Sequence, residues 1–260
     1  MITRPAAVAG YFYEAEANRL RDHVTQLLGA ETAVSTQLPD VLIVPHAGYV
    51  YSGSTAASAY RCLMHQPEKI QRVLLIGPAH RVYVAGMAIP SVDAFATPLG
   101  KVELDRAELD RMATLPGVEV SDEAHRQEHS LEVQLPFLQV ALSRFRLIPV
   151  LVGGADSGTV AALIDSLEVD DNTLVLISSD LSHFLQYDVA RDVDASTCSK
   201  IIEKTTTLTG EQACGARAIN GLMASRLARD LQVELLTACN SGDTAGSRDR
   251  VVGYASFALH

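Results

Sequence analysis

Four runs of apolar residues, each the length of a buried strand, constrain most strongly how this chain can fold. They lie at residues 41–45, 73–77, 147–152 and 173–178. The runs are continuously apolar instead of alternating, which is typical of strands covered on both faces inside a sheet. Two later runs, at 233–237 and 251–257, are predicted to be a closing pair that can run antiparallel, and 87–90 is a shorter strand candidate.

Segments with the apolar spacing of helices separate these runs. They occur at 15–28, 54–64, 104–112, 131–142, 158–167, 190–202 and 216–228. Strands that alternate with helices predict a three-layer α/β fold, with a central mixed, largely parallel sheet flanked by helices. No linker, internal repeat or break in composition divides the chain, so we expect a single domain over residues 1–260.

Charge and cysteine usage argue against several classes of protein. The net charge of −10 disfavours a nucleic-acid or anionic-membrane binder, because both need a basic surface. No apolar run reaches the roughly 20 residues that a membrane span requires. The four cysteines include no CxxC pair, and the first residues show no signal-peptide pattern. We therefore expect a reduced, cytoplasmic protein.

Two histidines follow apolar strands at similar bends. His46 comes after Pro45, and His80 comes after a Gly-Pro pair. Loops at the carboxyl ends of strands in an open α/β sheet are where ligands gather. Each histidine alone can be explained as a ring hydrogen-bonded within a turn, but two such arrangements together favour a site.

Cys214 is the third candidate residue for a functional site. A helix is predicted to begin beside it, at Gly215. A helix N-terminus lowers the pKa of a thiol and gives more thiolate, the species that binds metal. Two imidazoles and one thiolate would make a three-point metal site with open coordination positions. The alternative is that Cys214 is a small buried apolar residue.

Two further clusters have functional and structural interpretations. His129 and Glu132 have helical i,i+3 spacing, so Glu132 can steady a substrate-facing His129, or the cluster can cap a helix. Asp180 and His183 follow a strand and suit general acid–base chemistry, whereas Asp180 can also cap the next helix. No Walker A, GxSxG, HExxH or GxGxxG motif is present, which disfavours nucleotide enzymes, serine hydrolases and zincins.

Seven ordered motifs resemble the Memo family over essentially the whole chain. They are PHAGY at 45–49, GPAH at 77–80, EHSLE at 128–132, SSDLSH at 178–183, CG at 214–215, NSGD at 240–243 and VGY at 252–254. The opening AGYFY at 9–13 is similar as well. Ala79 departs from the family pattern, in which serine is frequent at this place.

Memo proteins are similar to the class III extradiol ring-cleaving dioxygenases of the LigB type, non-haem iron enzymes with one LigB/phosphorylase-like α/β domain. The resemblance implies metal ligation by His46, His80 and Cys214, with iron(II) favoured and copper or zinc as alternatives. Ring-cleaving relatives carry a carboxylate where this chain has Cys214, which puts ring cleavage itself in doubt.

The same resemblance assigns the surroundings of the metal. His183 matches the acid/base histidine of the ring-cleaving relatives, with Asp180 beside it. His129 would lie near the pocket, and Tyr51 and Phe12 would border its mouth. Bacterial and archaeal Memo proteins are associated with a radical-SAM protein and a third partner, which implies the same partners here.

We therefore expect a metal-dependent redox enzyme that resembles dioxygenases and acts on a small molecule or a peptide. Two alternatives remain. One is a hydrolase with a Cys214 nucleophile, assisted by His183 and Asp180. The other is a non-catalytic module that binds a peptide or a partner protein in the same pocket.

Overall fold

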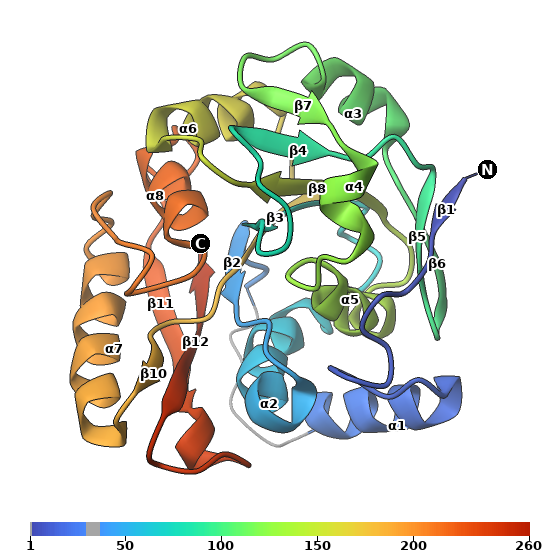
Figure 1. The fold of residues 1–260 in the computed structure, drawn as a ribbon. Helices are drawn as coiled ribbons and strands as arrows, with labels where there is room; N and C mark the ends of the chain where they lie inside the picture. Colours follow the sequence, from blue (N-terminus) through green and yellow to red (C-terminus); the bar gives the residue numbers. More distant parts are fainter. Residues whose placement is uncertain (1, 30–36) are drawn as a thin grey trace.

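The computed structural model describes residues 2–29 and 37–260 and shows a sheet enclosed by helices (Figure 1). Within those residues nine strands form the main sheet, in the order β10-β12-β2-β9-β3-β8-β4-β7, with β11 paired to β12. The strands are β2 (Val41–Val44), β3 (Arg72–Pro78), β4 (Met87–Ile89), β7 (Val118–Val120), β8 (Arg146–Val152), β9 (Thr173–Ser178), β10 (His183–Leu185), β11 (Val233–Asn240) and β12 (Val251–Leu259). The predicted α/β class is confirmed.

The four apolar runs form the parallel centre of this sheet. β2 pairs in parallel with β9, and β3 lies parallel between β9 and β8. The direction changes on both sides, because β12 pairs antiparallel with β2 and β4 pairs antiparallel with β8. The mixed sheet with an antiparallel closing pair, β11 and β12, is therefore as predicted. Parallel strands bring their carboxyl ends to one edge of a sheet, which fixes where a site can form.

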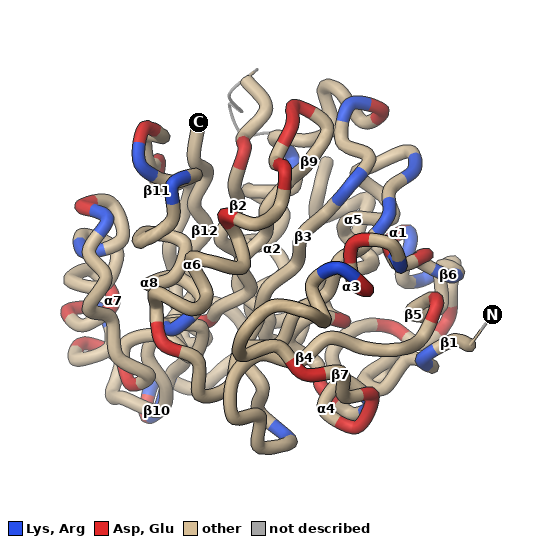
Figure 2. Tube along the Cα trace, turned by 90° about the horizontal axis from the view of Figure 1, so that it is seen from above, with Lys and Arg blue, Asp and Glu red and all other residues tan. Residues whose placement is uncertain are grey.

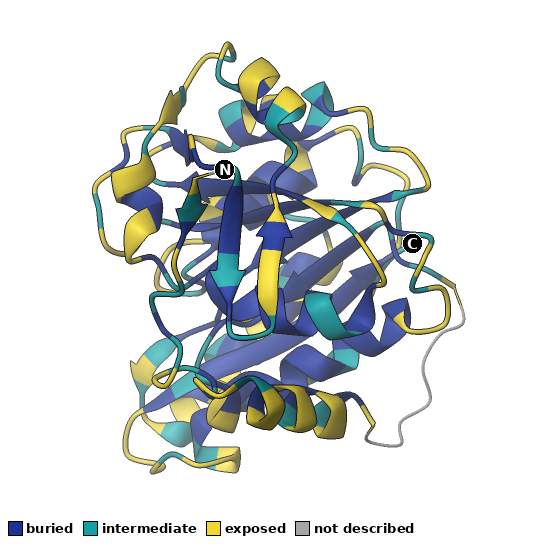
Figure 3. Ribbon diagram, turned by 90° about the vertical axis from the view of Figure 1, so that its right-hand side faces the viewer, coloured by how far each residue is buried: buried dark blue, intermediate teal, exposed yellow. Residues whose placement is uncertain are grey.

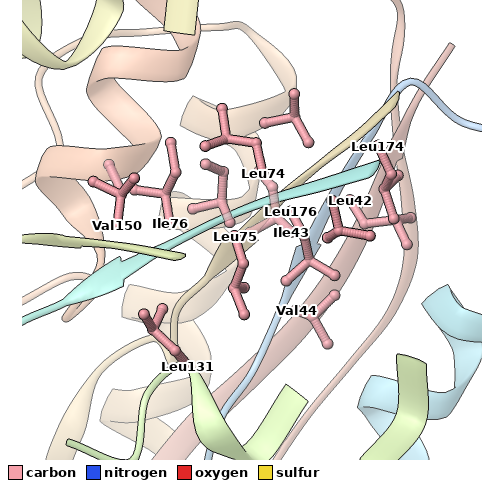
Figure 4. Close-up of a cluster of buried hydrophobic side chains, with 14 of the residues drawn as sticks. Leu42, Ile43, Val44, Leu74, Leu75, Ile76, Leu131, Val150, Leu174 and Leu176 are labelled. Carbon is pink, nitrogen blue, oxygen red and sulfur yellow. The ribbon is translucent and has the colours of Figure 1, made fainter. Parts of the chain in front are cut away.

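The core lies between this sheet and its helices. Apolar side chains of β2, β3 and β9 interdigitate there (Figure 4), and the central strands are dark blue, meaning buried, in Figure 3. Leu42, Leu75 and Leu176 are fully buried. Burying one such side chain contributes about 1.5–3 kcal/mol relative to leaving it exposed, so continuous apolar runs hold these strands in the middle layer.

Helices cover both faces of the sheet (Figure 1). One group contains α1, α2 and α5, which contact one another, while α6 packs with α8, and α7 contacts β11 and β12. The helices are α1 (Ala17–Leu28), α2 (Tyr49–Tyr60), α3 (Arg106–Met112), α4 (Asp122–Arg126), α5 (Leu135–Ala141), α6 (Ser157–Ser166), α7 (Tyr187–Ile202) and α8 (Ala216–Ala224).

Three predicted helices differ from the observed ones. The helix predicted at 216–228 ends at Ala224. The segment 131–142 is not one helix but a 3-10 turn, Glu132–Gln134, followed by α5. Pro136 lies in the first turn of α5. Backbone N–H groups in a first turn have no partner within the helix, so a proline costs no hydrogen bond there and favours a helix start. The helix predicted at 54–64 begins earlier, at Tyr49, directly after Gly48.

The N-terminal segment forms a smaller sheet and a buried ion pair. β1 (Thr3–Arg4) pairs with β5 (Ala94–Thr97), and β5 pairs with β6 (Gly100–Glu103). Arg4 Nη1 donates to Glu132 Oε2 at 2.6 Å, and both side chains are buried. Arg4 also donates to the carbonyls of His125 and Glu128, so the N-terminus is tied to the loop that carries His129.

Acidic and basic residues are interspersed over the outer helices and loops, whereas the central strands carry few charges (Figure 2). Among the residues that the structure describes, no helix combines the length and apolar character needed to cross a membrane.

Candidate metal centre

The candidate site lies at the carboxyl ends of three neighbouring parallel strands. His46 follows β2, His80 follows β3, and Asp180 follows β9, which lies between those two strands in the sheet. His46 and His80 are therefore brought together across β9, although 33 intervening positions separate them in the sequence. Their ring centroids are 5.3 Å apart.

A third imidazole, that of His129, completes a cluster. One ring nitrogen from each of His46, His80 and His129 lies within 4.8 Å of the others, an arrangement that can hold a metal ion. The centroid of the His129 ring is 5.5 Å from that of His46 and 4.9 Å from that of His80. The sequence placed His129 near the pocket but did not identify it as a candidate ligand, because it follows no strand of the sheet.

His46 is fixed at two points and faces the cluster with its remaining nitrogen. Its Nδ1 lies 2.9 Å from Ser178 Oγ, and its backbone N–H donates to Asp180 Oδ1 at 2.7 Å. Burial, together with the neighbouring imidazoles of His80 and His129, holds the pKa of His46 well below its usual value. The ring is therefore neutral at physiological pH, which is the form that ligates a metal.

Glu128 holds the other two histidines. Its carboxylate accepts from the His80 backbone N–H at 2.6 Å and lies 3.0 Å from His80 Nδ1. It also accepts from the backbone N–H of His129 and of Ser130. Burial raises the pKa of Glu128, but these hydrogen bonds outweigh it and leave the pKa well below the usual value. Sequence reasoning missed Glu128, although a glutamate directly before His129 was a visible signal.

The expectation that Glu132 steadies His129 is wrong. Residues 127–131 are not helical, since α4 ends at Arg126, so the i,i+3 geometry does not arise. Glu132 instead turns to the N-terminal segment, where it accepts from Arg4, from Tyr13 Oη and from the backbone N–H groups of Ala7 and Val8.

Cys214 lies beside the cluster, in the turn before α8. Its Sγ is 3.3 Å from His46 Nε2 and accepts from the Asp180 backbone N–H at 3.3 Å. Burial, followed by the charge of Asp180, raises the pKa of this thiol to about 12. The expected lowering by the helix N-terminus is thus overturned, because removal of the sulfur from water outweighs the helix dipole. A bound metal ion would reverse this balance by stabilising the thiolate.

Asp180 and His183 lie in one loop but have separate partners. Asp180 holds the His46 backbone, and burial raises the pKa of its carboxyl group. His183 Nδ1 lies 2.9 Å from the Leu181 carbonyl, which leaves Nε2 as the nitrogen available to a substrate. A second buried carboxylate, Asp194 on α7, accepts from the Ser182 backbone N–H at 3.0 Å and fixes this loop. Asp194 was not singled out in the sequence, because it lies mid-helix without a motif.

The two aromatic residues expected at the mouth lie in different settings. The Phe12 ring packs against His129, with centroids 4.7 Å apart. Tyr51 is in the first turn of α2, shortly after His46, and 38% of it is exposed. Contact of either residue with a substrate stays a prediction.

A cavity of about 710 Å³ opens beside the site. His80 and Cys214 form part of its wall. The loop after His80, the segment after β8, residues 208–210 and the start of α8 supply most of the rest. Its volume falls in the range of roughly 300–1,000 Å³ that is typical of small-molecule sites. A molecule in this cavity would lie against two of the three side chains that the sequence identified as ligands.

Comparison with known proteins adds sequence and fold relationships to this geometry. The family model described as "Memo-like protein" matches residues 4–258. A MEMO1 family protein of Pyrobaculum arsenaticum is 35% identical over 100% of both chains. Those of Aquifex aeolicus and Methanosarcina barkeri are 33% and 36% identical, each over 98% of both chains. An uncharacterized protein of Escherichia coli K12 shares the fold, with a TM-score of 0.54 at 10% identity, over 86% of this chain and 100% of that one.

Proposed function

Since this chain belongs to the Memo family, as its ordered motifs indicated, we propose that it is a metal-dependent redox protein with a non-haem iron(II) site. Its substrate would be a small molecule or a peptide, in chemistry that resembles that of the dioxygenases. The observation that carries the proposal is the convergence of His46, His80 and His129, with the Cys214 sulfur 3.3 Å from His46 Nε2.

The donor set fits a first-row transition metal. Imidazole nitrogen suits iron, copper and zinc, and a thiolate adds a soft ligand. His46 and His80 each have Nδ1 engaged by another side chain, which leaves Nε2 as the nitrogen that would ligate. Nε2 of His46 contacts the Cys214 sulfur, a ligand of the same proposed ion. His129 Nδ1 is buried and lies 3.2 Å from Glu128 Oε1 without forming a hydrogen bond. We propose His46, His80 and Cys214 as ligands, with His129 within reach of the same ion.

Iron bound there would supply one-electron chemistry and polarise an oxygen-containing ligand. The protein's own residues would bind and orient the substrate and move protons. His183 would exchange a proton through Nε2, while Asp194 keeps its loop in place. Phe12 would shield His129 from water on one side, and the cavity beside Cys214 would receive the substrate.

The contacts of Cys214 do not favour the hydrolase alternative. A nucleophilic cysteine needs a thiolate and a base within hydrogen-bonding reach. The imidazole in contact with Sγ is that of His46, and burial raises the pKa of the thiol to about 12. His183 instead makes its hydrogen bond with the Leu181 carbonyl.

The test is metal analysis of protein purified without oxygen. Wild-type protein should retain close to one equivalent of metal, whereas His46→Ala and Cys214→Ser should retain much less. Cys198→Ser is the matched control, because Cys198 is a buried cysteine on α7 and should not affect the metal content. Equal metal content in all four proteins would refute the proposed site. If the wild type does retain metal and the two site variants do not, substrate oxidation would next be measured with the metal-loaded wild type.

A further inference from the structure

We propose that Glu128 is a positioning residue that selects which nitrogen of His80 and of His129 faces the metal. This inference rests on the proposed function and adds to it a carboxylate shared by two imidazoles. Glu128 is 2% exposed and lies on the loop between α4 and the 3-10 turn at Glu132–Gln134. No sequence motif assigned it a role.

The contacts of Glu128 with His80 fix both the position and the tautomer of the His80 ring. Glu128 Oε2 accepts from the backbone N–H of His80 at 2.6 Å, and Oε1 lies 3.0 Å from Nδ1 of the same residue. A carboxylate accepts and does not donate, so His80 must carry its proton on Nδ1. This leaves the lone pair on Nε2. Anchoring of both backbone and ring also prevents the imidazole from flipping.

The same oxygen serves His129. Glu128 Oε1 accepts from the His129 backbone N–H at 3.0 Å and lies 3.2 Å from Nδ1, a contact that lacks the alignment of a full hydrogen bond. The His80 and His129 rings are stacked, with an interplanar angle of 24°. One negative charge at Nδ1 of both stacked rings therefore directs both toward the same tautomer.

His46 is held by other residues than Glu128, so it provides an internal reference for testing the role of Glu128. Its Nδ1 faces the hydroxyl of Ser178, and the Asp180 carboxylate accepts from its backbone N–H. Carboxylates that hydrogen-bond a ligand histidine fix its tautomer and raise its basicity, and their loss typically weakens metal binding about 10- to 100-fold. Loss of Glu128 should affect His80 and His129 and leave His46 unchanged.

The experiment compares Glu128→Gln with Asp165→Asn. Asp165 on α6 is also a largely buried carboxylate that accepts from a backbone N–H, but its partner is Arg226, after α8. Zinc affinity, measured by competition with a chelating dye, should fall about 10- to 100-fold in Glu128→Gln and stay unchanged in Asp165→Asn. Glu128→Asp retains the charge and should recover part of the affinity. Equal losses in Glu128→Gln and Asp165→Asn, or none in either, would overturn the proposal.

A second readout needs no metal. Nitrogen-15 spectra of the histidine side chains in metal-free protein should show His80 and His129 protonated on Nδ1. In Glu128→Gln those signals should shift, while the signal of His46 should not. If the wild type binds no zinc, the proposed function fails, and these spectra still decide the role of Glu128. Unchanged His80 and His129 signals in Glu128→Gln would refute it.

Discussion

Replacement of Arg4 by methionine tests how strongly the N-terminal segment is tied to the site. Arg4 and Glu132 are 5% and 0% exposed and form an ion pair of 2.6 Å. Methionine keeps much of the apolar stem of arginine but removes the guanidinium. The change therefore leaves Glu132 buried with its charge no longer compensated, and also leaves the carbonyls of His125 and Glu128 without this donor.

Breaking a buried ion pair from one side costs about 3–5 kcal/mol, because the remaining charge stays in a medium that solvates it poorly. Glu132 keeps hydrogen bonds from Tyr13 and from the backbone of Ala7 and Val8, so we expect about 3 kcal/mol, the lower end. An exposed pair at a similar distance, Arg126–Glu123 at 2.7 Å, should contribute far less, because water solvates and screens both charges.

The assay is urea denaturation followed by circular dichroism, with Arg126→Met as the matched control. Arg4→Met should lower the free energy of unfolding by about 3 kcal/mol and Arg126→Met by much less. Adding Glu132→Gln to Arg4→Met should restore some stability, because a neutral amide is less costly to bury than a carboxylate. The reasoning is refuted if Arg4→Met and Arg126→Met cost the same, or if the second substitution destabilises further.

Two other predictions concern Gly253, on β12 beside Asp194, and Cys214. In Gly253→Ala, the new Cβ would overlap with the carboxylate of Asp194. We therefore expect a loss of about 1–3 kcal/mol in the same assay, and unchanged stability would contradict the close approach. In metal-free protein, burial raises the pKa of the Cys214 thiol to about 12 from the usual 9.0, so the neutral thiol persists as pH rises. Alkylation of Cys214, followed by mass spectrometry, should keep accelerating between pH 9 and 12, and a plateau near pH 9 would show that the sulfur is not desolvated.

Much of the fold followed from the residues themselves. The runs at 41–45 and 73–77 are apolar without interruption, and burial on both faces is the arrangement that stabilises such strands most. Because parallel strands share an edge for their carboxyl ends, His46 and His80 were expected at one place. The order of motifs along the chain also predicted the family, and the family model that matches residues 4–258 confirms it.

The partners of the site residues were less predictable. Glu132 was assigned to His129 on helical spacing, but the intervening residues are not helical, and Glu132 binds Arg4 instead. The carboxylate that holds His129 is its neighbour Glu128. The acidity of Cys214 was misjudged for a similar reason, since a helix N-terminus is visible in a sequence but desolvation of a sulfur is not.

Local patterns of apolar residues were enough to predict the alternation of strands and helices and the edge of the sheet where polar side chains collect, and the ordered motifs were enough to predict the family. The fold was needed to show that His129 joins His46 and His80, that Glu128 contacts two rings, and that Cys214 is a buried thiol. Hydrogen-bond partners and desolvation depend on which loops lie together in space, and packing between distant segments determines that arrangement.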